Sequence, residues 1–192
     1  MVDNIVFLLY KRPETVFTLK DISLLFPNIS YDNLKERMSY FSKTGAIKKL
    51  RRGIYVKDNF DVLELANKVY APSYISLETV LVKEGVVFQY YQSVSAVSYV
   101  SRSIQLGEQT FIYRKIKNEI LLNKQGIEQR GNVMIASKER AFLDAVFLYK
   151  NYHFDNLRPL DFAKIKELQN IYESKALNER VADYAHDQSI KT

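Results

Sequence analysis

The densest group of chemically active side chains is basic and lies in a short segment near the amino terminus. Residues 46–57 contain no acid, and their five cations are Lys48, Lys49, Arg51, Arg52 and Lys57. Each cation that neutralises a nucleic-acid phosphate releases counterions and so adds salt-sensitive affinity. The segment therefore predicts phosphate contact, and the alternative is a solvated basic hairpin without a ligand.

The residues just before this segment could read the edges of bases. Leu34, Met38 and Phe41 recur at helical spacing, which predicts a helix that buries them and turns its polar residues outward. Arginine suits a bidentate contact to guanine and asparagine a contact to adenine, so Arg37 and Asn33 are the best candidates. The candidates on this helix are Tyr31, Asn33, Lys35, Arg37 and Lys43.

One observation and one alternative explanation count against a base-reading role for this helix. Asp32 and Glu36 are also expected on its exposed surface, where they would repel phosphate. Ordinary surface polarity is the alternative explanation for each candidate taken singly.

The elements that must position these side chains are three short helices and a hairpin. Ile5, Leu8 and Leu9 predict a helix over residues 2–11, and Thr18 is a suitable cap for a second over residues 19–26. Ser30 can cap the third helix over residues 31–43, and Gly45 can end it. The segment 46–57 reads as a β-hairpin around Gly53. This order is that of a winged helix-turn-helix, whose third helix enters the major groove.

The rest of the chain predicts a second domain, so the expected class is α+β with domains over residues 1–59 and 60–192. Residues 86–136 are rich in Val, Ile, Tyr, Phe and Thr, which indicates a mostly antiparallel sheet. The helices expected in this domain cover residues 61–70, 72–85, 137–150, 161–172 and 175–186.

Charge is divided unevenly between the two predicted domains. Residues 1–59 hold eleven Lys or Arg against six Asp or Glu, whereas residues 60–192 hold seventeen against sixteen. The excess at the amino terminus indicates a polyanionic partner. The absence of cysteine and of a long apolar run predicts a cytoplasmic protein with no membrane association, and two histidines leave little for a metal.

An enzyme is not expected. The chain has no Gly-rich phosphate loop, paired-histidine motif or nucleophile elbow, so no cofactor, metal or catalytic residue is predicted. Arg140 and Asp144 have the i, i+4 spacing of an intrahelical ion pair, which we interpret as a structural pair at the edge of the core.

Three separated segments resemble one known family. Residues 44–56, residues 72–81 with Gly85, and residues 136–144 together are similar to the AbiEi family of antitoxins of type IV toxin-antitoxin systems. The resemblance implies a bacterial abortive-infection antitoxin that opposes a nucleotidyltransferase toxin. It also implies autorepression through inverted repeats in promoter DNA. Members of this family are thought to counter the toxin without a stable complex.

The resemblance places DNA contact on the third helix and on Lys48, Lys49, Arg51 and Arg52. It marks the second domain without assigning roles to its residues. Two alternatives stay open: an interaction module that binds the toxin directly, and a plain transcriptional repressor.

Overall fold

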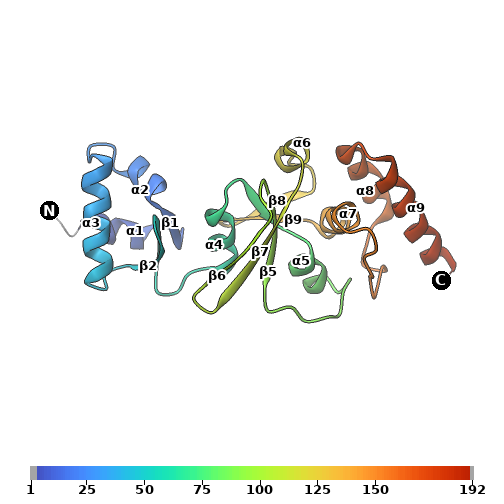
Figure 1. Ribbon diagram of the computed structural model, residues 1–192, viewed down its shortest axis with the longest axis horizontal. Helices are drawn as coiled ribbons and strands as arrows, with labels where there is room; N and C mark the ends of the chain where they lie inside the picture. The colour runs from blue at the N-terminus through green and yellow to red at the C-terminus, as the bar shows by residue number, and fades with distance from the viewer. Residues whose placement is uncertain (1–3, 191–192) are drawn as a thin grey trace.

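The computed structural model describes residues 4–190, which form an α+β fold drawn out along one axis (Figure 1). The first part of the chain contains three helices and three short strands. They are α1 (Asn4–Lys11), β1 (Val16–Thr18), α2 (Leu19–Leu25), α3 (Tyr31–Lys43), β2 (Lys48–Arg51) and β3 (Ile54–Val56).

The three predicted helices and the hairpin are confirmed. The predicted positions 2 and 3 of the first helix lie outside the described residues. The sequence interpretation missed β1, which pairs antiparallel with β3 and completes a sheet of order β1–β3–β2. A three-residue strand is too short to show a hydrophobic period by itself, so its pairing with β3 defines it.

Local capping fixes where α2 and α3 begin. Thr18 and Asp21 form a reciprocal capping box, in which each side chain accepts the backbone amide of the other at 3.0 Å. The Ser30 hydroxyl accepts the amide of Asn33 at 3.4 Å, as the sequence predicts for the third helix. Leu34, Met38 and Phe41 are buried in a cluster with residues of α1, α2 and Tyr55.

The second part is a six-stranded sheet covered by helices. Its strands are β4 (Ser73–Ile75), β5 (Val94–Ser98), β6 (Arg102–Leu106), β7 (Gln109–Lys115), β8 (Ile127–Arg130) and β9 (Val133–Ala136). Its helices are α4 (Val62–Val69), α5 (Glu78–Lys83), α6 (Asn118–Leu122), α7 (Lys138–Leu148), α8 (Phe162–Leu168), the 3₁₀ turn η1 (Gln169–Tyr172) and α9 (Lys175–Ile190).

The strand order of this sheet is β6–β7–β5–β4–β9–β8, which the expectation of a mostly antiparallel sheet describes only in part. Three pairings are antiparallel, but β5 with β7 and β4 with β9 are parallel. Local sequence predicts strands, whereas the direction of pairing depends on which distant strands become neighbours. The sheet is therefore mixed.

The expected helix over residues 72–85 is also wrong in its first half. Residues 73–75 form β4, which lies inside the sheet between β5 and β9, and only Glu78–Lys83 are helical. Tyr74 and Ile75 are buried there. The apolar pattern of this segment fits a buried strand or a helix equally, and tertiary pairing selects the strand.

Helix α4 lies between the two sheets (Figure 1). Two of its polar side chains, Glu64 and Asn67, bond to backbone groups on either side. The buried carboxylate of Glu64 accepts from the Thr15 amide at 3.0 Å, the Thr15 hydroxyl at 2.6 Å and the Val16 amide at 3.3 Å. On the other side, the Asn67 side chain accepts the amide of Met134 at 2.8 Å. Both contacts satisfy backbone groups that burial would otherwise leave unpaired.

The predicted domain boundary at residue 59 falls just ahead of α4, and the core continues across it. Val16, Ile54 and Val56 lie in the three-stranded sheet β1–β3–β2, called the small sheet. They belong to the same buried cluster as Leu65 of α4 and the buried residues of the six-stranded sheet, called the large sheet. The assignment of two domains stays a prediction.

A buried ion pair organises the far side of the large sheet. Arg140 and Asp144 of α7 have fully buried side chains, with 3.5 Å between Arg140 Nε and Asp144 Oδ1. Asp144 accepts hydrogen bonds from Tyr74 (3.1 Å), Ser76 (2.7 Å) and Tyr172 (2.6 Å). The pair predicted at the edge of the core is thus inside it.

The partners of this ion pair come from widely separated elements. The Arg140 guanidinium donates to the carbonyl of Ile120 in α6 at 2.7 Å and to that of Gln125 at 2.9 Å. Burial and the nearby Asp144 carboxylate raise the pKa of the Tyr74 and Tyr172 phenols well above the usual value, so both act as donors to the carboxylate.

No helix in residues 4–190 has both the length and the apolar character needed to cross a membrane.

We predict that Asp144→Ala lowers the free energy of unfolding by about 3–5 kcal/mol, because it leaves the Arg140 charge buried without its partner. Denaturant unfolding followed by circular dichroism would measure this loss. Asp183→Ala, which removes an exposed carboxylate from α9, is the matched control and should change stability by about 0.5 kcal/mol or less. A similar small change in both variants would contradict the structural role of the pair.

Candidate nucleic-acid interface

All nine residues predicted from the sequence to bind DNA lie on α3, β2 and the turn that follows β2. Arg37 is half-buried and the other eight are exposed. Five belong to α3, three to β2 and Arg52 to the turn. The structure therefore brings the predicted residues to the same end of the molecule. Those on α3 are divided between two flanks of the helix, and those on the hairpin between two faces of its sheet.

The helical period separates the α3 candidates into two flanks. At 3.6 residues per turn, Asn33 and Lys35 point roughly 160° apart around the axis, while Asn33 and Arg37 lie on the same flank. The Arg37 Nε–H donates to the Asn33 side-chain oxygen at 2.8 Å. These two candidates, expected to read different bases, are paired with each other in the free protein.

Tyr31 and Lys35 occupy the other flank of α3, and Tyr31 lies near Tyr55 of the hairpin. Burial raises the pKa of Tyr55 on β3, and the neighbouring Tyr31 phenol raises it further. The outermost positions between the two flanks include Asp32 and Glu36, both exposed. Carboxylates there repel phosphate but can accept from the cytosine amino group, so this surface suits a base edge better than a backbone.

The basic hairpin is divided between the two faces of its sheet. Side chains of directly opposed residues point to the same face, and Lys49 is opposite Tyr55, which packs with α3. A bulge in β2 between Lys49 and Arg51 then sets Arg51 opposite Ile54, which packs with the second part of the chain. Lys49 therefore lies on the α3 side, whereas Arg51 lies on the side of α4.

One charge of the hairpin segment has a structural role. Lys57 donates to the carbonyl oxygens of Tyr10 at 3.2 Å and Arg12 at 2.6 Å, just where α1 ends. A cation at the carboxyl end of a helix satisfies carbonyls that lack intrahelical partners. Gly53 has φ +79° and accepts the Leu19 amide at 2.8 Å, which fixes the hairpin turn to the start of α2.

Sequence reasoning missed two residues beside the hairpin: Tyr70, which Arg51 approaches, and Arg102, which contacts Tyr70. The Arg51 guanidinium lies 5.8 Å from the centre of the Tyr70 ring, and Arg102 Nη1 donates to the Tyr70 hydroxyl at 3.4 Å. Arg102 is 51 positions from Arg51 in the chain, so no local pattern could have associated them. The tertiary fold places both arginines beside Tyr70, which follows α4.

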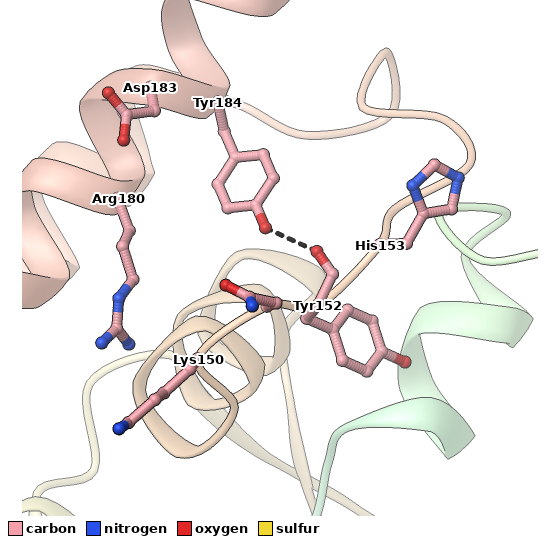
Figure 2. Close-up of a pocket in the computed structure, with 7 residues that line it drawn as sticks. Lys150, Tyr152, His153, Arg180, Asp183 and Tyr184 are labelled. Carbon is pink, nitrogen blue, oxygen red and sulfur yellow. Dashed lines mark hydrogen bonds between the residues drawn. The ribbon is translucent and has the colours of Figure 1, made fainter.

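A hollow lies at the other end of the molecule. It lies beside α9 and is lined by Lys150, Asn151, Tyr152, His153, Arg180, Asp183 and Tyr184. Figure 2 shows the Tyr184 hydroxyl donating to the Tyr152 carbonyl, while the Tyr152 ring turns away from Arg180. The lining contains no serine, threonine or cysteine nucleophile. Within the described residues, no three His, Asp or Glu side chains are grouped as a metal site would require.

No protein-family model matches the chain, and no curated protein matches its sequence.

We predict that Asn33→Ala releases Arg37 from its intrahelical contact. Exchange of the Arg37 Nε–H with solvent should become faster, and α3 should lose about 0.2–0.5 kcal/mol from the missing i, i+4 pair. Nitrogen-15 NMR of the arginine side chains measures the exchange. Lys35→Ala, on the opposite flank, is the control and should leave the Arg37 signal unchanged. An equal signal in wild type and Asn33→Ala would show that the pair does not persist in solution.

Proposed function

We propose that residues 1–59 are a winged helix-turn-helix that binds duplex DNA and that the chain represses its own operon. The observation that carries the proposal is the order and contact of the elements: α3 with an exposed polar surface is followed directly by the basic β2–β3 hairpin, which serves as the wing. In this arrangement α3 enters the major groove and the wing follows the phosphate backbone. The absence of any acid from residues 46–57 supports the phosphate contact.

The residues of the interface have different expected roles. Arg37 and Asn33 would read bases after their mutual hydrogen bond is exchanged for bonds to base edges. Lys49, on the α3 side of the wing, would contact a phosphate. Tyr31, Lys35, Lys43, Lys48 and Arg52 would add phosphate or groove contacts around these three.

We propose further that the protein is a cytoplasmic antitoxin that opposes a nucleotidyltransferase toxin. This part rests on the resemblance of residues 44–56, 72–81 and 136–144 to AbiEi antitoxins. Several residues of the latter two segments are buried together, as Tyr74 and Ser76 contact Asp144. Their shared role is therefore in the protein interior, and the surface that opposes the toxin would lie elsewhere.

The DNA-binding proposal predicts that the double variant Arg37→Ala, Lys49→Ala binds its own upstream DNA more weakly. Loss of two phosphate or base contacts should reduce the slope of log K against log salt by up to about 2. Fluorescence anisotropy at several salt concentrations measures both quantities.

The matched control for this test is Lys166→Ala, Lys175→Ala, which removes the same charge from exposed positions on α8 and α9. These helices lie at the opposite end of the molecule from α3 (Figure 1). Identical affinity and slope in the two double variants would refute the assignment of the interface.

The antitoxin proposal predicts that co-expression of the chain restores growth of cells that express a nucleotidyltransferase encoded beside it. The Arg37→Ala, Lys49→Ala variant should restore growth equally, because repression and antitoxicity would use different surfaces. Colony counts under toxin induction are the measurement. Failure of the wild-type chain to protect would leave a plain repressor, and co-purification as a stable complex would favour the direct toxin binder.

A further inference from the structure

Two arginines from different sheets approach one tyrosine at the junction between the small sheet and the large sheet. Tyr70 follows α4, and its hydroxyl accepts from Arg102 of β6 at 3.4 Å. The guanidinium of Arg51, on β2, lies 5.8 Å from the centre of the same ring. Both arginines are exposed, so their remaining N–H groups can reach a ligand from solvent.

The tyrosine is held firmly by its neighbours. Its ring packs edge-on against Tyr113, with 4.8 Å between ring centres, and against Tyr99 at 6.4 Å. The Tyr113 hydroxyl donates in turn to the carbonyl of Ala66 in α4 at 2.8 Å. Tyr70 therefore gives both arginines a fixed surface to pack on.

A third cation lies on the same face of the large sheet. Arg102 is paired with Tyr113 in the β6–β7 ladder, and Lys115 follows two residues later along β7, so all three side chains share one face. Lys115 is exposed, and its amide donates to the Ser101 hydroxyl at 3.0 Å, which orders the strand end.

Arg51, Arg102 and Lys115 form a cationic cluster around Tyr70, and carboxylates do not balance its charge. Arg51, Arg102 and Lys115 take part in none of the ion pairs found in the described part of the chain. Burial raises the pKa of the Tyr70 phenol, but the Arg102 and Arg51 guanidinium groups outweigh it and hold the pKa below its usual value. Like charges gathered around a neutral group repel one another, and an anion placed between them removes that repulsion.

We propose that Arg51 and Arg102, assisted by Lys115, bind a phosphate of the DNA backbone beside the wing, so that DNA contact extends onto the large sheet. This inference rests on the proposed DNA-binding function. Duplex phosphate is the ligand because the cluster continues the basic wing: Lys48 is opposite Val56 and shares the α4 side of the small sheet with Arg51. Guanidinium groups suit phosphate because their planar forks can each donate two parallel hydrogen bonds.

The test compares Arg102→Ala with Arg130→Ala in the full chain. Arg130 is an exposed arginine on β8, the edge strand at the other side of the same sheet, so its loss changes net charge equally but far from the cluster. With duplex DNA from upstream of the gene as the probe, Arg102→Ala should reduce the salt slope by about 0.9 and weaken binding roughly tenfold at 0.15 M salt. Arg130→Ala should match the wild type within about twofold.

Arg102→Lys separates charge from geometry. It should keep the wild-type salt slope, because the charge remains, and lose part of the affinity, because the planar fork is gone. Equal thermal midpoints of the variants and the wild type show that folding is preserved.

The outcomes distinguish this inference from the proposed function beneath it. If the wild type does not bind duplex DNA, both fail. If the wild type binds and the Arg37→Ala, Lys49→Ala variant is impaired while Arg102→Ala equals Arg130→Ala, only the phosphate site on the large sheet is refuted.

Discussion

The buried ion pair between Arg140 and Asp144 is the constraint on which the second part of the structure depends. Two opposite charges with no solvent exposure need close pairing and further hydrogen bonds to offset the loss of water. Those bonds come from β4, from the carbonyls around α6 and from η1, which fixes the relative positions of elements that are up to a hundred residues apart. The same requirement explains why segments 72–81 and 136–144 carry distinctive polar residues within apolar surroundings.

Helix α4 extends this order to the amino-terminal part. Glu64 accepts from two backbone amides at the start of β1, while Asn67 accepts from the amide of Met134 in β9. An exposed ion pair could shift with salt, whereas buried side chains bonded to backbone groups hold one geometry. The basic hairpin is consequently fixed in orientation toward the large sheet, and Arg51 and Arg102 both approach Tyr70.

The basic surface of the amino-terminal part is divided among several environments. The hairpin is not one uniform basic surface, since its two faces present cations to different neighbours and Lys57 is used within the fold. Likewise α3 has two polar flanks, and the carboxylates of Asp32 and Glu36 lie between them. One flank carries the hydrogen-bonded Asn33–Arg37 pair. A protein that reads DNA with such a surface would rely on a few oriented contacts supplemented by phosphate contacts from both sheets.

The sequence by itself determined the helices of the amino-terminal part, the caps at Thr18 and Ser30, the basic hairpin, and the exposed side chains of α3. Each of these depends on residues within a few positions of one another, and hydrophobic period, capping and turn chemistry act over that range. Tertiary structure alone decided that residues 73–75 are a strand, that two strand pairings are parallel, and that Arg51 and Arg102 meet at Tyr70. These features join residues far apart in the chain, and the free energy that selects them comes from burial and hydrogen bonding in the assembled core, which no local window contains.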